Sequence, residues 1–194
     1  MDKLSYALGL SMGQNFKGSG IDKINADDVA DALRAVYDGQ EKKMSFNEAK
    51  RVVEEFFTDL EQRAGETNKK AGAEFLAKNA KEKGVKVTAS GLQYLVVKEG
   101  NNVKPTADDV VTVHYTGRLI DGTVFDSSEQ RGEPATFALK QVIAGWTEGL
   151  QLMGEGAAYR FFIPSELAYG AHGTGPILPH STLIFDVQLL KVNK

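Results

Sequence analysis

Residues 110–128 read V-V-T-V-H-Y-T-G-R-L-I-D-G-T-V-F-D-S-S, and this stretch decides the fold of the second half of the chain. Apolar and polar side chains alternate over residues 111–116, which is the pattern of a strand with one buried face. The Asp121-Gly122 pair that follows is typical of a two-residue hairpin turn in which both residues take a positive φ. The stretch therefore predicts two antiparallel strands, the second of which ends at the carboxylate of Asp126.

The rest of the second half continues this strand pattern. Strands are predicted at residues 92–97, 159–163 and 183–189, and a short helix at residues 145–150 carries the single tryptophan, Trp146. Four or five antiparallel strands with one short helix make an α+β fold.

The first half of the chain has helical periodicity instead. Apolar residues recur at every fourth position from Leu4 to Phe16, which predicts one amphipathic helix. Asn25 is a predicted N-cap for a second helix. The sequence S-F-N-E at residues 45–48 is a capping box and predicts the start of a third.

The third helix is predicted to run from residue 46 to about residue 83. Residues 61–74 contain no large apolar side chain and no proline, and a helix that is polar on all sides usually bridges two bodies. An unbroken helix of this length would span about 55 Å. There are two alternatives. The helix could bend at Gly65 or Gly72, because glycine weakens a helix by about 1 kcal/mol relative to alanine. The segment could also form two helices joined by a flexible linker.

Composition excludes several classes of protein. The 194 residues carry a net charge of −3 and no cysteine, which argues against a nucleic-acid binder and excludes disulfides and zinc sites made of thiolates. No apolar run reaches the length of a membrane span, and the first ten residues lack the pattern of a secretory signal. We therefore expect a cytoplasmic protein, or a periplasmic one if a signal peptide has been removed.

The apolar stripes of residues 1–60 are too extensive for so small a body to bury by itself. Domains of this size are marginally stable alone, and pairing with a second copy would cover the stripes. We expect a homodimer that forms through residues 1–60.

The common catalytic and metal-binding motifs are incomplete. His114, His172 and His180 lack the spacing of metal ligands, no G-x-S-x-G elbow is present, and the glycine-rich loop at residues 170–176 lacks the P-loop lysine. Hydrolase, kinase and dehydrogenase functions each lack essential parts. A set of aromatic and branched side chains around one carboxylate remains: Tyr115, Phe125, Val142, Ile143, Trp146, Tyr169 and Phe185. Core packing would explain any one of them.

Four stretches of sequence resemble the FKBP-type peptidyl-prolyl cis-trans isomerases. They are V-H-Y-T-G-R-L-I-D-G-T-V-F-D-S-S at 113–128, V-I-A-G-W-T-E-G-L-Q-L-M at 142–153, I-P-S-E-L-A-Y-G at 163–170 and L-P-H-S-T-L-I-F-D-V-Q-L-L-K-V at 178–192. The resemblance covers residues 88–194. It implies an isomerase domain in which an antiparallel sheet wraps on a short helix, and it implies no cofactor and no metal.

Residues 1–87 resemble, more weakly, the helical N-terminal extension of bacterial members of the macrophage infectivity potentiator type. The motif that carries this resemblance is L-S-Y-A-L-G-L-S-M-G at 4–13. That group forms homodimers through its N-terminal helices, so residues 1–87 are expected to be a dimerisation domain that includes the helix at 46–83.

The resemblance also implies which residues form the active site. It assigns catalytic positions to Tyr115, Phe125, Asp126, Trp146, Tyr169 and Phe185. It assigns substrate contacts to Val142, Ile143, Ile177 and Arg131, with Arg131 beside the aspartate and a tyrosine. Trp146 corresponds to the floor of the family's pocket.

Two positions depart from the family's pattern. Ala135 stands where small eukaryotic members carry an aromatic residue, which lowers one wall of the pocket. The loop after Gly170 is one residue shorter, and the usual I-P-P reads I-L-P at residues 177–179. Both departures affect the rim of the pocket and the substrate preference.

The reaction of this family suits a site without acid–base groups. Rotating the bond before proline breaks no covalent bond, and its barrier of roughly 18–20 kcal/mol comes from amide resonance. A twisted amide is less polar than a planar one, so an apolar pocket favours the twisted state over the ground state. Tyr169 is the candidate hydrogen-bond donor to the substrate carbonyl.

The expected partners are proline-containing peptides and unfolded proteins, and macrolide inhibitors of the family, whose binding Ala135 would weaken. Two other functions are open: a dimeric holdase chaperone with subsidiary isomerase activity, and an inactive domain that serves as an adaptor. Separating the halves of the chain would discriminate between the isomerase and the holdase. Isolated residues 88–194 should keep peptide isomerisation, whereas efficient catalysis on a refolding protein should need the dimer.

Overall fold

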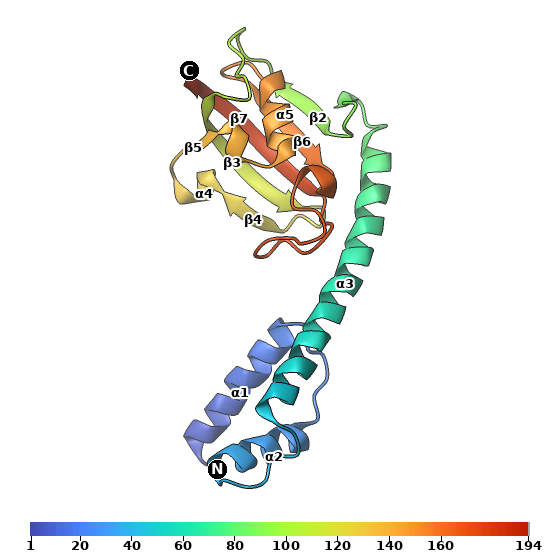
Figure 1. Ribbon diagram of the computed structural model, residues 1–194. Coiled ribbons are helices and arrows are strands. Elements are labelled where there is room, and N and C mark those ends of the chain that lie inside the picture. The colour runs from blue at the N-terminus through green and yellow to red at the C-terminus, as the bar shows by residue number, and fades with distance from the viewer. Residues whose placement is uncertain (194) are drawn as a thin grey trace. The chain divides into compact units, whose positions relative to one another are not determined.

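The computed structural model describes residues 1–193, and the chain divides into two compact units, Met1–Leu60 and Glu61–Lys194. The first unit consists of helices α1 (Lys3–Gly18) and α2 (Ala26–Tyr37) and the beginning of α3 (Phe46–Asn79). The second unit contains the rest of α3 and the antiparallel sheet (Figure 1). The α+β fold expected from the sequence is confirmed.

The helix starts follow the predicted caps. The side-chain oxygen of Asn25 accepts a hydrogen bond from the backbone N–H of Asp27 at 3.0 Å. At the start of α3, the Glu48 N–H donates to Ser45 Oγ at 3.2 Å, and the Ser45 N–H donates to Glu48 Oε2 at 2.8 Å. This reciprocal pair is the predicted capping box, and it satisfies donors that a helix start leaves free.

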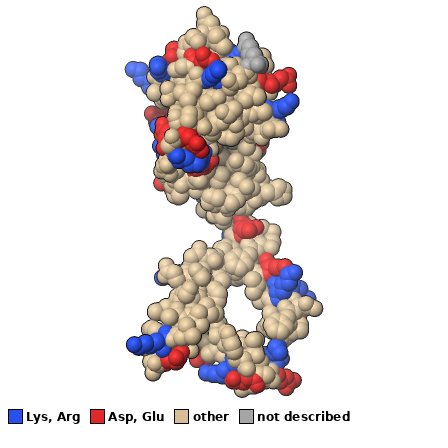
Figure 2. Space-filling model, turned by 90° about the vertical axis from the view of Figure 1, so that its left-hand side faces the viewer, with Lys and Arg blue, Asp and Glu red and all other residues tan. Residues whose placement is uncertain are grey.

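The first unit has almost no core of its own. Within residues 1–60, all of which the structure describes, Ala35 is the one buried residue. Large apolar side chains such as Leu4, Tyr37 and Phe46 are exposed by 70%, 84% and 68%. Figure 2 shows an opening between the helices of this unit. The helices therefore present apolar faces that the unit itself leaves uncovered.

Helix α3 is continuous over 34 residues, so the alternatives of a linker or two helices are wrong. The helix ends at Asn79, four residues before the predicted end. Turns follow, and Gly84 then takes a φ of 87°, a left-handed conformation that glycine adopts readily. None of the helices described within residues 1–193 is long and apolar enough to cross a membrane.

The sheet of the second unit is antiparallel throughout. Within residues 1–193 it has seven strands in the order β1-β2-β6-β7-β3-β4, with β5 paired to β3. The strands are β1 (Val85–Val87), β2 (Gln93–Lys98), β3 (Val110–Leu119), β4 (Val124–Ser127), β5 (Ala135–Ala138), β6 (Ala158–Ile163) and β7 (Leu183–Asn193). The predicted number of four or five strands was wrong, because the short strands β1 and β5 were missed.

Helix α5 (Ala144–Leu152) lies against one face of this sheet (Figure 1). Two glycines allow the close approach: a Cβ at Gly145 would stand 2.5 Å from Ile163, and one at Gly149 would stand 2.7 Å from Phe161. Trp146, on the same helix, is 4% exposed. The core of the second unit therefore lies between α5 and the sheet, as the resemblance implied.

The turn between β3 and β4 differs from the prediction. Gly122 has a φ of 90°, but His180 is the single residue other than glycine with a positive φ in the described chain. Asp121 therefore does not take the expected positive φ. Its side chain accepts a hydrogen bond from the Thr123 N–H at 2.8 Å, so the turn is closed by an aspartate side chain.

The compact units meet at residues 60 and 61, within α3. The second half of α3 packs on the sheet: the ring centroids of Phe75 and Phe162 are 6.0 Å apart, and the Gln93 amide donates to the carbonyl of Leu76 at 2.9 Å. The division at residue 87 proposed from the sequence stays a prediction.

Candidate active site

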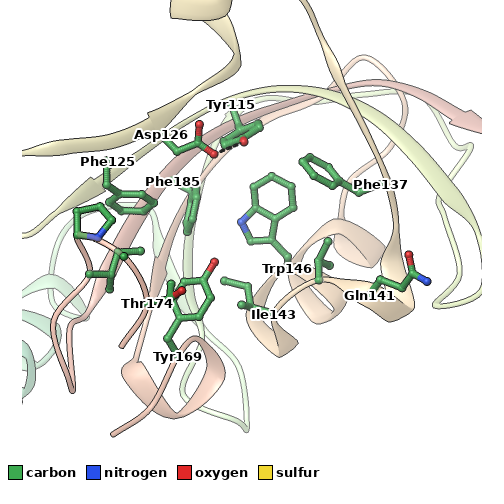
Figure 3. A pocket seen from close by; sticks show the side chains of 14 residues that line it. Tyr115, Phe125, Asp126, Phe137, Gln141, Ile143, Trp146, Tyr169, Thr174 and Phe185 are labelled. Atoms are coloured by element: carbon green, nitrogen blue, oxygen red, sulfur yellow. Dashed lines mark hydrogen bonds between the residues drawn. The ribbon is translucent and has the colours of Figure 1, made fainter. Parts of the chain in front are cut away.

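A cavity of about 490 Å³ opens in the second unit, between β3, β4, β7, α5 and the segment before β7. Figure 3 shows the side chains that line it. They are Tyr115, Phe125, Asp126, Phe137, Gln141, Val142, Ile143, Trp146, Tyr169, Thr174, Gly175, Pro176, Ile177 and Phe185. A cavity of this size with a mainly aromatic and aliphatic lining and few polar groups is typical of a site for a small ligand or a short peptide segment.

Trp146 forms the floor of the cavity. Its ring meets those of Tyr115, Phe137 and Phe185 edge to face, with centroids 5.1, 5.4 and 5.3 Å apart. Such contacts are the preferred geometry of aromatic pairs. The indole of the cavity floor is thus packed among three aromatic rings.

One carboxylate lies in the cavity wall, and both of its oxygens are engaged. Tyr115 OH donates to Asp126 Oδ2, and the Arg131 guanidinium pairs with Asp126 Oδ1. A second guanidinium nitrogen of Arg131 donates to Tyr115 OH at 3.0 Å. The three groups sit on β3, on β4 and on the short helix α4 (Ser128–Arg131), so the β3–β4 pairing places them together.

The surroundings of these groups shift their pKa values. Burial raises the pKa of the Asp126 carboxyl, but the hydrogen bonds from Tyr115 and Arg131 outweigh it and hold the pKa below its ordinary value. Burial, and then the bond to Asp126, raises the pKa of Tyr115. Asp126 is therefore an anion and Tyr115 a neutral phenol at neutral pH, and neither is poised to exchange a proton there.

Tyr169 approaches the cavity from the segment that follows the 3₁₀ turn Ser165–Leu167. It is 38% exposed, and its hydroxyl points toward the space between Phe185 and Trp146 (Figure 3). Burial, and then the charge of Asp126, raises the pKa of Tyr169. Its phenol is therefore neutral at neutral pH and can donate a hydrogen bond to a bound carbonyl.

Nine of the ten site residues expected from the resemblance line this cavity. Arg131 is the tenth, and it lies behind the lining, in contact with Asp126 and Tyr115. The catalytic or binding role of each residue stays a prediction.

The sequence reasoning missed five lining residues: Phe137, Gln141, Thr174, Gly175 and Pro176. Phe137 could have been found, because it lies two positions after Ala135 on β5 and so on the same face. Ala135 does not line the cavity, whereas Phe137 does, so an aromatic side chain still forms that wall. Gln141 ends the short 3₁₀ turn Leu139–Gln141, and the other three lie in the loop before β7, so neither segment is long enough for periodicity to carry a signal.

The histidines take no part in the cavity. His114 Nδ1 lies 3.1 Å from Ser128 Oγ, a contact within the β3–α4 region. Within residues 1–193, no three histidine, aspartate or glutamate side chains gather as a metal site would require.

The sequence matches known families along nearly its whole length. Residues 101–190 match the family described as FKBP-type peptidyl-prolyl cis-trans isomerase. Residues 1–96 match the domain amino-terminal to FKBP-type peptidyl-prolyl isomerase.

Several bacterial proteins are similar to the chain. A probable FKBP-type peptidyl-prolyl cis-trans isomerase FkpA of Neisseria meningitidis is 48% identical over 206 residues, which cover 99% of this chain and 74% of that protein. Outer membrane protein MIP of Legionella longbeachae is 47% identical over 201 residues, covering 100% and 86%. The FKBP-type 22 kDa peptidyl-prolyl cis-trans isomerase of Escherichia coli is 40% identical over 196 residues, covering 97% and 93%.

A solved structure has a similar fold. The crystal structure of FkpA from Escherichia coli superposes with a TM-score of 0.77 at 38% identity, and the match covers 98% of this chain and 95% of that one. The chain belongs to the FKBP-type peptidyl-prolyl cis-trans isomerases, and its activity is rotation of the peptide bond that precedes a proline.

Proposed function

We propose that the Trp146 cavity is the isomerase site and that it acts by stabilising a twisted amide. The observation that carries the proposal is the state of Asp126, the one carboxylate of the cavity, which is already bound on both oxygens by Tyr115 and Arg131. A site whose carboxylate is engaged in this way offers no free base. It offers shape, exclusion of water and a few fixed dipoles.

These features match the reaction. The barrier of roughly 18–20 kcal/mol comes from amide resonance, which the twisted state has lost. The twisted amide is the less polar species, so transfer from water into an aromatic cavity favours it over the planar amide. The proline ring would rest on Trp146, and Tyr169 OH would donate to the carbonyl of the residue before proline. Asp126 would order Tyr115 and supply a fixed field at the rotating carbonyl.

Two substitutions test the assignment. Tyr169→Phe removes the donor, and Asp126→Leu removes the charge and frees Tyr115. We expect each to lower kcat/KM on a proline tetrapeptide by about tenfold, the order of one well-placed hydrogen bond to a polarised group. The assay is a protease-coupled or NMR measurement of cis-trans exchange.

Tyr94→Phe is the matched control, because Tyr94 stacks on Tyr159 at 5.8 Å and lies outside the cavity. The control should keep the full rate. Wild-type rates in both Tyr169→Phe and Asp126→Leu, with the fold intact, would rule the assignment out.

Binding of the family's macrolide inhibitors belongs to the same proposal. Phe137 supplies an aromatic wall close to Ala135, so the weakening expected from Ala135 should be small. Trp146 is the single tryptophan and lies at the cavity floor, and titration of its fluorescence with a macrolide measures the affinity directly. An unchanged signal at saturating macrolide, with no inhibition, would exclude binding in the cavity.

We further propose that the protein is a homodimer formed through residues 1–60. The exposed apolar side chains of α1 and α2 support this, because Ala35 alone is buried in that described unit. A second copy of the same surface covers such faces with closed symmetry. The expected mass in light scattering is twice 21.1 kDa.

The double substitution Leu4→Glu with Leu8→Glu tests the interface on α1, where the two side chains are 70% and 55% exposed. It should yield single chains, while Gln14→Glu on the same helix should stay dimeric. A wild-type mass of one chain at micromolar concentration would refute the dimer.

The isomerase function is favoured over the holdase, since the Neisseria and Escherichia relatives are isomerases by name.

We also propose that the protein works outside the cytoplasm. The name of the Legionella longbeachae relative, an outer membrane protein, supports this location and gives no support to the expected cytoplasmic one. Fractionation of the native cells tests it, and recovery in the cytoplasmic fraction would contradict it.

A further inference from the structure

We propose that Asn68 on α3, together with Gly65 and Gly72, positions the active-site segment 169–182. These three residues lie outside the cavity. They act on the reaction through Tyr169, which this segment carries, so the inference rests on the proposed role of Tyr169. The second half of α3 would then contribute to isomerase activity by positioning the segment that carries Tyr169.

Asn68 is the hydrogen-bonding group of this contact. Its side-chain amide donates to the carbonyl oxygen of Pro179 at 3.0 Å and lies 3.4 Å from Ser181 Oγ. The amide is half-buried in a stretch of α3 whose other polar side chains are mostly exposed. One side chain thus holds a turn that is 111 positions away in the sequence.

Two glycines bring the helix close enough for this contact. Gly65 and Gly72 are buried, and they lie three residues before and four residues after Asn68, on one helix face. A Cβ at Gly65 would stand 3.1 Å from the Pro179 side chain, and one at Gly72 would stand 2.4 Å from Thr182 Oγ1. Each glycine weakens the helix by about 1 kcal/mol relative to alanine. Close packing of α3 on segment 169–182 explains why glycine stands at both positions despite this cost.

The held turn connects directly to the cavity. Ser181 Oγ donates to the carbonyl of Leu178 at 2.7 Å, and Leu178 follows Ile177 of the cavity wall. The His180 N–H donates to the carbonyl of Gly170 at 2.8 Å, and Gly170 follows Tyr169. The turn that Asn68 binds therefore fixes both ends of the segment that carries Tyr169 and Ile177.

The backbone of His180 shows that the turn is held against its own preference. Its φ is 56°, a left-handed value that residues other than glycine adopt rarely and that persists where the surroundings enforce it. Asn68 and Gly65 supply part of these surroundings, since a Cβ at Gly65 would stand 3.1 Å from the Pro179 side chain and 3.4 Å from the His180 ring. Without them the turn can relax, and a smaller fraction of molecules would hold Tyr169 in its active position.

Asn68→Ala is the first test. Loss of one hydrogen bond of ordinary strength changes such an equilibrium constant by about fivefold, so we expect kcat/KM on a proline tetrapeptide to fall by up to about fivefold. Gln62→Ala is the matched control, because Gln62 is an exposed amide on the same helix. It should keep the wild-type rate.

Coupling to Tyr169 separates a positioning role from general destabilisation. If Asn68 acts through the Tyr169 hydroxyl, Asn68→Ala should lower kcat/KM by less than about twofold in a Tyr169→Phe background. A loss of folded protein would instead lower the rate by the same factor in both backgrounds, and that result would overturn the inference.

Gly72→Ala is the second test, and it carries its own rescue. The added methyl group overlaps Thr182 Oγ1, so it should displace the segment and lower kcat/KM. Gly72→Ala combined with Thr182→Ala removes the overlapping oxygen and should recover most of the rate. Thermal melting confirms that each variant is folded at the assay temperature.

The outcomes distinguish this inference from the proposed function. Wild-type rates in folded Asn68→Ala and Gly72→Ala overturn the positioning role and leave the Trp146 site untouched. A wild-type rate in Tyr169→Phe alone would overturn the role of Tyr169 in catalysis. In that case Asn68 cannot act through the Tyr169 hydroxyl either, so the inference fails together with that role.

Discussion

Asp126 is the one charged residue of the cavity lining, and its partners set the pH range over which that charge persists. Burial raises the pKa of Asp126, but its bonds with Tyr115 and Arg131 bring the pKa below the ordinary value. The pKa values of Tyr115 and Tyr169 are raised by burial. With ordinary values of about 3.9 for aspartate and about 10 for tyrosine, no group of this set titrates near neutral pH.

We therefore expect kcat/KM on a proline peptide to be constant between about pH 5 and pH 9. NMR exchange spectroscopy measures it without a coupling protease, whose own pH dependence would interfere. The folded-state pKa of Asp126 lies below the unfolded value, so its contribution to stability is present above about pH 4 and is lost as the pH falls through the folded pKa. A bell-shaped rate profile centred near pH 7 would contradict this expectation.

Phe137 gives a second prediction at the scale of single residues. Its ring lies edge to face on Trp146 and on Tyr115, with centroids 5.4 and 5.9 Å apart. Phe137→Leu removes both contacts, each of which is worth about 0.5–1.5 kcal/mol, and lowers one wall of the cavity. We expect KM to rise by about fivefold while kcat changes little, because the hydrogen-bonding groups stay in place.

Steady-state kinetics on a proline tetrapeptide measures the two constants. Phe56→Leu on α3 is the control, since Phe56 is 43% exposed and lies outside the cavity. A fall in kcat at constant KM would place Phe137 among the residues that act on the transition state.

Much of the site could be predicted from the sequence because the family resemblance assigns residues position by position, including Tyr169 and Ile177, which lie outside the helices and strands. Alternation on strands and the single tryptophan made Tyr115, Trp146 and Phe185 candidates, and the resemblance assigned them to the site. The resemblance also placed Arg131 beside the aspartate and a tyrosine, and the structure shows that the tyrosine is Tyr115. Thr174 and its neighbours lie in an irregular segment, where no periodicity marks which side chains turn inward.

At the scale of elements, Gln93 shows how α3 is bound to the sheet. This residue of β2 is 5% exposed. Its amide donates to the carbonyl of Leu76 at 2.9 Å and accepts from the Asn79 side chain at 2.8 Å. The Leu76 carbonyl also accepts a hydrogen bond from the Ala80 N–H at 3.0 Å. Gln93 therefore gives this carbonyl a second donor and joins the last turn of α3 to the sheet.

Gln93→Leu should therefore destabilise the second unit by about 1–3 kcal/mol, because it removes two hydrogen bonds of about 0.5–1.5 kcal/mol each. Urea unfolding, followed by Trp146 fluorescence, measures the change. Gln188→Leu on β7 is the control, since Gln188 is exposed, and it should stay within about 0.5 kcal/mol of the wild type. Equal losses in the two variants would show that the hydrogen bonds of Gln93 contribute nothing to stability.

The elements themselves were predicted where the local signal is strong. Asn25 and the capping box at residues 45–48 predicted two helix starts, and the alternation of apolar and polar residues predicted β3 and β7. The three-residue strand β1 and the alanine-containing β5 are too short for a periodic signal. The pairing of β3 with β7, which joins residues more than 60 positions apart, is a non-local event that periodicity alone does not reveal.

At the scale of the whole molecule, the boundary between the compact units falls inside a continuous helix. The first unit ends at Leu60, and the second begins at Glu61. A helix that is polar on all sides was expected over residues 61–74, and the structure shows why polarity there does not prevent packing. Gly65, Asn68 and Gly72 make the contact, so the face of α3 that packs on the rest of the second unit carries few large apolar groups.

This boundary predicts how fragments of the chain should behave. A fragment of residues 61–194 keeps the contacts of α3 with the sheet, including the pair Phe75–Phe162. A fragment of residues 88–194 loses them and exposes Phe162 and Gln93, which are 7% and 5% exposed in the full chain. The loss of these contacts should lower the Tm of the shorter fragment by about 10 °C relative to the longer one.

Differential scanning calorimetry measures the two melting temperatures, and peptide exchange measures the two rates below both transitions. We expect the longer fragment to keep the kcat/KM of the full chain on a tetrapeptide, because the cavity and the contacts that position it lie within residues 61–194. The shorter fragment should show a lower kcat/KM even when fully folded, since it lacks Asn68 and the glycines on either side of it. Equal melting temperatures and equal rates in the two fragments would mean that the second half of α3 serves only as a connection between the two units.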